Sequence, residues 1–211
     1  VGPFAIAEGL VAPVDGLTKV WIWQQNIGQR IDAFVPVRHR EVLEDGAFMD
    51  DGVPFPGAEI RLEFLEPPPL PGAADSVPLL PSGAPQDELS VPGVGAVRAT
   101  MITAGNPTVF IRADALGLTG RELPDDVNRR RKLLAQLEAI RAAAAVRMGL
   151  ADSAAFATAY RPATPKVAWV ARPAGYRTSA GVDVGADRID LLARIVSMGR
   201  LHHAFTGTGS I

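Results

Sequence analysis

The residues best suited to hold a small anion lie at the end of the chain. There, glycines alternate with hydroxyl side chains: Thr206, Gly207, Thr208, Gly209 and Ser210. Glycines let the backbone approach an anion closely, and the free N–H groups at the start of a helix attract negative charge. A flexible tail explains the same composition, because chain ends are often poorly ordered. The pattern alone leaves both interpretations open.

A second candidate is Asn106, which stands in a Gly-Asn-Pro sequence at the head of an apolar stretch. Pro107 has a fixed φ and keeps the preceding residue out of the helical region. Asn106 should therefore be held rigidly, and its amide could bind a carboxylate or carbonyl group of a ligand. An ordinary turn is the alternative, because Asn and Gly are both favoured in turns.

Three further groups also have a chemical and a structural interpretation. His202 and His203 could supply a general base, but adjacent histidines without a third ligand are usually structural. The basic residues 129–132 could bind a phosphate, although a solvated charge run on a helix is favoured. Asp50 and Asp51 could form a carboxylate pair, but a turn is favoured in a loop rich in glycine and proline.

The composition argues against several classes of partner. The chain has 211 residues, 47% of them hydrophobic and 21% charged, as in a globular protein with one large or two small domains. A formal net charge of −2 disfavours nucleic-acid and membrane-surface partners. With no cysteine and three histidines, we expect no disulfide, no cysteine nucleophile and no metal site in these residues. No apolar run reaches the roughly 18 residues of a membrane span.

The elements that must position these residues form an α+β pattern. An apolar helix is predicted to end near Gly9, and a long helix is predicted from Pro124 to Gly149, with apolar residues at helical spacing. From residue 188 the chain starts as a strand, and the pattern leaves open whether it extends to Ser197. Because strands and helices do not alternate regularly, a doubly wound parallel sheet is disfavoured. Residues rich in β-branched and aromatic side chains predict strands at 19–26, 30–37, 59–65, 88–91, 96–103, 106–113 and 165–173.

A proline-rich stretch divides the chain. Seven prolines lie between Pro67 and Pro85, a composition that suits an extended connector. We therefore predict one domain at residues 1–68 and a second at residues 69–211.

Five ordered segments together resemble the 2-methylaconitate cis–trans isomerase family of the PrpF type: VGPFAIAEGLV, AGNPTVFIRADALGLTG, LEAIRAAAAVRMGLA, TPKVAWVARP and SMGRLHHAFTGTGSI. The resemblance covers nearly the whole chain. It implies a fold similar to diaminopimelate epimerase, with two lobes that are each a β-rich half-barrel around a central helix. On this view the chain is an internal fragment with both lobes incomplete. Residues 1–68 would be the C-terminal part of the first lobe, and residues 69–211 the second lobe before its central helix.

The same resemblance implies roles for single residues. Asn106 matches an asparagine that contacts the substrate, and Ser197 and Lys166 match further positions expected to bind it. Residues 207–210 would open the central helix of the second lobe and hold a substrate carboxylate. Thr206 stands where an epimerase has its second cysteine, which disfavours racemisation by two thiols and makes its hydroxyl a candidate participant.

The implied function is the movement of an allylic proton in a small unsaturated tricarboxylate such as 2-methylaconitate, with no metal or organic cofactor. The enzyme would act in the cytoplasm, in propionate catabolism through the methylcitrate cycle, and the family is compatible with a homodimer. A 4-oxalomesaconate tautomerase is an alternative, as is a non-catalytic fragment or small-anion binder. The family's catalytic cysteine and lysine would precede Val1, so we expect the chain alone to be inactive.

Overall fold

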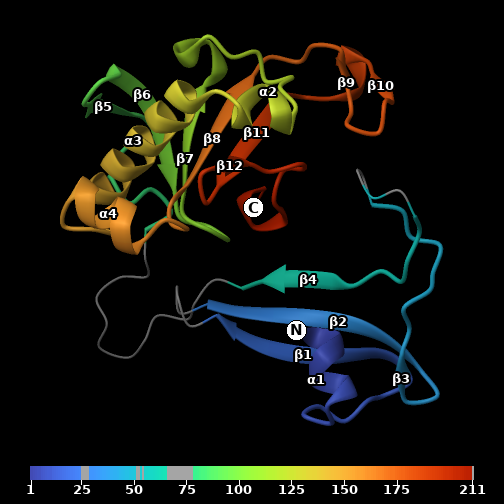
Figure 1. Cartoon of the computed structure of the whole chain (residues 1–211). Helices are drawn as coiled ribbons and strands as arrows, with labels where there is room; N and C mark the ends of the chain where they lie inside the picture. Colours follow the sequence, from blue (N-terminus) through green and yellow to red (C-terminus); the bar gives the residue numbers. More distant parts are fainter. Residues whose placement is uncertain (25–28, 51–52, 54, 66–77, 211) are drawn as a thin grey trace. The chain divides into compact units, whose positions relative to one another are not determined.

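The protein forms two compact units, Val1–Ser76 and Val77–Ile211, each containing helices and strands (Figure 1). The computed structural model describes residues 1–24, 29–50, 53, 55–65 and 78–210. The predicted boundary between residues 68 and 69 and the first part of the proline-rich connector lie outside the described residues.

The first unit is an antiparallel sheet with one short helix on a face. Its elements are α1 (Gly2–Ala7), β1 (Gly16–Gln24), β2 (Gln29–Arg38), β3 (Glu41–Val42) and β4 (Arg61–Phe64). Strand β2 is central, with β1 along one edge and β3 and β4 along the other. The helix packs on the sheet through a small core of Ala5, Ile6, Val20, Ala33, Val35 and Val37. The strands predicted in this unit and the N-terminal helix are confirmed within a few residues at their ends, while residues 25 and 26, predicted to end the first strand, lie outside the described residues.

The second unit contains a six-stranded sheet in the order β12-β11-β8-β7-β6-β5. Its strands are β5 (Asp87–Val91), β6 (Gly95–Ile102), β7 (Thr108–Arg112), β8 (Lys166–Ala171), β11 (Leu192–Ser197) and β12 (Arg200–Leu201). Neighbouring strands are antiparallel except β7 and β8, which are parallel. A parallel pair needs a long crossover connection, and the α-helices of this unit lie in that connection. The strand predicted from residue 188 begins at Leu192 and does extend to Ser197.

The continuous helix predicted from Pro124 to Gly149 is wrong. The structure has α2 (Pro124–Asn128) and α3 (Arg131–Arg147), separated at Arg130, whose φ of −93° and ψ of 80° are not helical. Packing explains the break, because Val127 and Leu133 are both buried. In one helix, residues six positions apart would point about 120° away from each other. The break lets both of them face the same core.

Several smaller elements complete the structure, and apart from the turn at residues 207–209 they were not predicted from the sequence. Helix α4 (Ala154–Tyr160) follows α3 and is capped by Ser153, whose side chain accepts a hydrogen bond from the Phe156 N–H at 3.2 Å. The 3-10 helices are η1 (Ala113–Leu116), η2 (Ala186–Arg188) and η3 (Gly207–Gly209), and a two-stranded ribbon joins β9 (Tyr176–Arg177) to β10 (Asp183–Val184). Among the described residues, no helix is both long and apolar enough to cross a membrane.

Helix α3 lies across one face of the six-stranded sheet and forms the main core with it (Figure 1). The core includes Met101, Val109, Ile111, Val167 and Trp169 from the strands and Leu133, Leu137, Ile140 and Ala144 from the helix. Successive side chains of a strand point to opposite faces. The residues between these core positions, such as Thr108, Phe110 and Lys166, therefore face away from α3.

The turn between β11 and β12 contains a strained residue. Met198 has a φ of 51°, Gly199 follows with a φ of 74°, and the Met198 side chain is 68% exposed. Two positive φ values in a two-residue hairpin favour Asn-Gly, and a non-glycine residue with a Cβ pays about 1–2 kcal/mol for this conformation.

We expect Met198→Asn to raise the free energy of unfolding by about 1 kcal/mol, because asparagine tolerates positive φ better than methionine. Urea denaturation followed by circular dichroism measures the change. Gly199→Ala is the opposing control and should destabilise the turn. Equal stability of the Met198→Asn protein and the wild type would show that the turn stores no strain.

Candidate functional site

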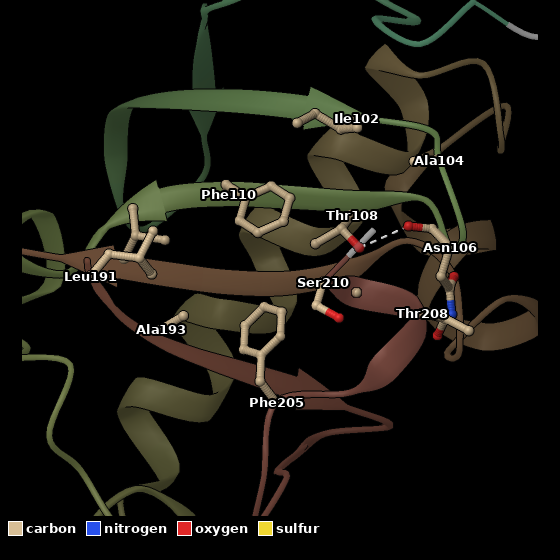
Figure 2. Close-up of a pocket in the computed structure, with 12 residues that line it drawn as sticks. Ile102, Ala104, Asn106, Thr108, Phe110, Leu191, Ala193, Phe205, Thr208 and Ser210 are labelled. Atoms are coloured by element: carbon tan, nitrogen blue, oxygen red, sulfur yellow. Dashed lines mark hydrogen bonds between the residues drawn. The ribbon is translucent and has the colours of Figure 1, made fainter. Parts of the chain in front are cut away.

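A cavity of about 320 Å³ lies on the face of the six-stranded sheet that points away from α3 (Figure 2). One part of its lining is apolar, with Ile102, Phe110, Val170, Leu191, Ala193 and Phe205. The polar part of its lining is formed by Asn106, Thr108, Thr208 and Ser210. The fold therefore brings Asn106 and the C-terminal Gly/Thr segment to one cavity, although they are about a hundred positions apart in the sequence.

Asn106 lies in the turn that leads into β7, as its Gly-Asn-Pro context predicts. The turn is held at two points. The Thr108 hydroxyl donates a hydrogen bond to the backbone carbonyl of Asn106 at 2.9 Å, and Thr108 itself is 1% exposed. The Lys166 N–H donates to the Pro107 carbonyl at 2.8 Å, which links the turn to the start of β8. These bonds set where the half-buried Asn106 side chain meets the cavity.

The C-terminal segment forms the single 3-10 turn η3. The Gly209 N–H donates to the Thr206 carbonyl at 2.9 Å, and the Ser210 hydroxyl donates to the Gly207 carbonyl at 2.7 Å. Within the described part of the chain, the N–H groups of Gly207 and Thr208 have no acceptor. The helix start expected at this segment is therefore present as one short turn with two N–H groups left over.

Glycine is required at position 209 by close packing. A Cβ atom there would lie 2.9 Å from the Ile195 side chain and 2.8 Å from Thr206 Oγ1, which is closer than real Cβ contacts. The turn consequently sits directly on β11. The Thr206 hydroxyl oxygen is buried and forms no hydrogen bond with the described residues.

Lys166 and Ser197 meet across neighbouring strands. Val167 of β8 pairs with Val196 of β11 in antiparallel register, so Lys166 lies opposite Ser197. The Lys166 Nζ donates a hydrogen bond to Ser197 Oγ at 2.7 Å. On its other side Lys166 pairs with Thr108 of β7, which lines the cavity. The two residues implied by the family resemblance therefore lie beside each other and next to Thr108, although neither of them is among the residues that line the cavity.

The charge of Lys166 is less stable here than in water. Burial lowers the pKa of the Lys166 ammonium, and repulsion from the nearby Arg141 guanidinium lowers it further. Both effects penalise the protonated form, and an anion placed next to the ammonium would oppose them. The cavity lining, the Lys166–Ser197 pair next to it and the η3 turn together offer an ammonium, a hydroxyl, an amide and two N–H groups, which are groups that bind a carboxylate.

The two histidines lie outside the cavity lining. The His202 Nδ1 lies 2.7 Å from the Ala204 carbonyl oxygen, and the ring stacks on His203 with centroids 4.7 Å apart. Neither histidine is among the residues that line the cavity. The structural interpretation is therefore favoured for both.

The remaining charged candidates that the structure describes are not among the residues that line the cavity. Residues 129–132 are all exposed, and Arg129 pairs with Asp125 at 2.6 Å, one helical turn earlier. Asp50 is exposed and its carbonyl accepts a hydrogen bond from the Val53 N–H, whereas Asp51 lies outside the described residues. Across the part of the chain that the structure describes, no three His, Asp or Glu side chains gather as metal ligands.

Sequence reasoning missed Thr108 and Arg141. Thr108 is a β-branched residue in a predicted strand, and nothing in its type distinguishes it from its neighbours. Arg141 did carry a signal, because it occupies the apolar stripe of its helix, four positions after Leu137 and three before Ala144. An arginine on such a stripe must find hydrogen-bond acceptors when it is buried.

Comparison with known proteins shows one consistent relationship. The family model described as PrpF protein matches residues 1–211. A 2-methyl-aconitate isomerase of Shewanella oneidensis is 48% identical over 219 residues, which cover 100% of this chain and 54% of that protein. A protein of the same name from Cupriavidus necator is 46% identical over 215 residues, with the same coverage of 100% and 54%.

The crystal structure of a methylitaconate-delta-isomerase has a similar fold. It superposes with a TM-score of 0.76 at 34% sequence identity, over 98% of this chain and 52% of that one. The chain therefore spans about half the length of the relatives that it matches.

Proposed function

The chain belongs to the PrpF protein family, and from this we propose that the full protein is a cis–trans isomerase of a small unsaturated tricarboxylate of the 2-methylaconitate type. The observation that carries the proposal is the match over the whole chain to relatives named 2-methyl-aconitate isomerase. The Asn106 amide in the cavity lining and the Lys166–Ser197 pair next to Thr108 support it, because amide, ammonium and hydroxyl groups bind carboxylates.

In the proposed reaction a base removes an allylic proton, the resulting dienolate rotates about the weakened double bond, and the proton returns to carbon. This chain would bind and orient the substrate. The Lys166 ammonium and the Ser197 hydroxyl would hold one carboxylate, and the Asn106 amide a second. The free N–H groups of Gly207 and Thr208 would stabilise negative charge as it develops. Family resemblance assigns proton transfer to a cysteine and a lysine outside these residues.

Other members of the candidate set have smaller proposed roles. The buried Thr206 hydroxyl has no partner among the described residues and could donate to the substrate. Gly209 would keep the turn against β11, and Ser210 lines the cavity.

We expect Asn106→Ala in the full protein to lower kcat/KM by roughly 10- to 100-fold, because a hydrogen bond to a charged group contributes about 1.5–3 kcal/mol. Proton NMR of 2-methylaconitate in D₂O, with EDTA present and no added cofactor, reports both isomerisation and exchange of the allylic proton. Unaltered turnover in a folded variant would remove Asn106 from the site. A wild-type full protein that converts no tricarboxylate would refute the proposed function.

The same assay separates the alternatives. A 4-oxalomesaconate-type tautomerase would exchange protons of 4-oxalomesaconate and leave 2-methylaconitate unchanged, and a small-anion binder would leave both compounds unchanged.

Family resemblance also supports four further proposals for the full protein. It would act in the cytoplasm, belong to propionate catabolism through the methylcitrate cycle, need no cofactor and form a homodimer.

A further inference from the structure

Arg141 of α3 is 3% exposed, and all five N–H bonds of its guanidinium are directed at acceptors. Glu138 accepts from Nε and Nη2 at 2.7 Å each. The other bonds go to backbone carbonyls: Nη2 donates to Ala157 at 3.0 Å, and Nη1 donates to Arg161 at 2.9 Å and to Thr164 at 3.0 Å. Because the donors of arginine form a rigid planar fork, this one side chain holds three carbonyls in a fixed arrangement.

These carbonyls belong to the chain segment that directly precedes Lys166. They belong to α4 and to the segment after it, and Thr164 precedes Lys166 by two residues. Lys166 in turn makes two contacts with the site. Its N–H donates to the Pro107 carbonyl at 2.8 Å, and its Nζ donates to Ser197 at 2.7 Å. The position of Lys166 therefore affects both the Asn106 turn and the Ser197 contact.

We propose that Arg141 is a positioning residue for this site: its guanidinium holds the backbone from which Lys166 projects, and through Lys166 it aligns the Asn106 turn and Ser197. The consequence for catalysis rests on the proposed function, whereas the alignment itself does not. Stability alone explains the arginine poorly, since an apolar residue of similar volume fills such a position without the cost of desolvating a charge. What arginine adds is the simultaneous binding of three carbonyls.

The charges around Lys166 agree with this role. The elements packed against β8 are α3, β7, β11 and η1. Their charged residues are Arg131, Lys132, Glu138, Arg141 and Arg147 on α3, Arg112 on β7, Arg194 on β11 and Asp114 on η1. Of these, Arg141 is the charge that lowers the pKa of Lys166, after the larger effect of burial. Glu138 is bound to the guanidinium and offsets part of its charge. Arg141 thus holds the backbone next to Lys166 and, together with the larger effect of burial, lowers its proton affinity.

Lysine-selective NMR tests the alignment directly, because the chain contains three lysines, Lys19, Lys132 and Lys166. The double variant Glu138→Gln/Arg141→Met removes the guanidinium without leaving a carboxylate unpaired. We expect the ¹³Cε resonance of Lys166 to titrate at higher pH in this variant than in Glu138→Gln, because the two proteins differ only in the positive charge at position 141 and removing it raises the pKa of a neighbouring lysine. We also expect the Lys166 amide to exchange with solvent at least about tenfold faster, since its bond to Pro107 is loosened.

Two further variants separate the effect of the Arg141 charge from the effect of its hydrogen bonds to the three carbonyls. Glu138→Gln is the matched control, because it keeps the guanidinium and its three carbonyl bonds, and it should raise neither the pKa of Lys166 nor the exchange rate of its amide. Arg141→Lys keeps a positive charge but cannot reach three carbonyls. It should increase amide exchange at Lys166 and change the pKa of Lys166 less than the double variant does. If the double variant fails to fold, Arg141→Lys alone tests whether Arg141 positions Lys166.

In the full protein, both Arg141 variants should lower kcat/KM at least about tenfold, with folding verified by circular dichroism. Lys166 titration and amide exchange that are the same in the Arg141 variants as in Glu138→Gln would overturn the positioning role. If the wild-type full protein converts no tricarboxylate, the proposed function fails, while the NMR comparison still decides whether Arg141 positions Lys166.

Discussion

Lys166→Met in the full protein is expected to lower kcat/KM for the tricarboxylate by roughly 30- to 1000-fold, which corresponds to about 2–4 kcal/mol. The Lys166 ammonium is half-buried and hydrogen-bonded to Ser197 at 2.7 Å, so it is placed to meet a substrate carboxylate with little solvent between them. Methionine is similar in length to the lysine side chain and removes the charge and the donors. The measurement is initial-rate kinetics on 2-methylaconitate.

The chain offers a matched control for this substitution. Lys132 is exposed on α3, outside the cavity lining, so Lys132→Met should leave kcat/KM unchanged. A folded Lys166→Met protein with wild-type kcat/KM would show that the ammonium does not bind the substrate.

The pH dependence of kcat/KM is a second test of whether the Lys166 ammonium binds the substrate. Burial and then Arg141 lower the pKa of the ammonium, and the protonated form is the one that binds a carboxylate. We therefore expect kcat/KM to fall on the alkaline side as Lys166 loses its proton, at a pH below the usual lysine range. Lys166→Arg should remove this decline, because arginine stays protonated. A decline that persists in Lys166→Arg would assign it to another group.

Trp169→Ala is expected to lower the free energy of unfolding by about 3–5 kcal/mol, the range for removing a large aromatic residue from a core. Trp169 is fully buried in β8, in the middle of the six-stranded sheet. Its Nε1 also donates to Glu122 Oε2 at 3.1 Å, and the same carboxylate accepts the N–H groups of Thr119 and Gly120. The substitution therefore creates a cavity and removes one donor from a partly buried carboxylate.

Urea denaturation followed by circular dichroism measures this loss. Trp169→Phe should cost less, since it keeps most of the aromatic volume and removes the hydrogen bond. Tyr160 is an aromatic residue of the same unit with 74% exposure, and Tyr160→Ala should cost below about 1.5 kcal/mol. Equal losses for Trp169→Ala and Tyr160→Ala would contradict the central place of Trp169 in the core.

Local sequence determined most of the elements and one feature of the site. The strands that became β5, β6, β7 and β8 were predictable because β-branched and aromatic residues favour a pleated, half-buried surface. The turn at Asn106 was predictable because Pro107 restricts the backbone on both sides of one peptide bond. These preferences act within a few residues, so they can be recognised without knowledge of the fold.

Packing across the sheet decided the structure of those segments for which local preference was not enough. Helical spacing from Pro124 to Gly149 predicted one helix, but the sheet requires Val127 and Leu133 to face the same core, and the chain breaks at Arg130 to allow it. The parallel pairing of β7 with β8 likewise depends on where the helical connection returns the chain. Neither requirement can be seen within a single segment.

The sequence by itself determined which residue types were present for binding an anion, and its family resemblance singled out Lys166 and Ser197. Only the tertiary structure decided which of the candidate residues meet. Antiparallel register places Lys166 opposite Ser197, and the cavity joins Asn106 to the C-terminal turn. The role inferred for Arg141 was out of reach of sequence reasoning, because the three backbone carbonyls that it holds lie 16 to 23 positions away. Every residue has such a carbonyl, so only its position in the folded chain makes it a partner.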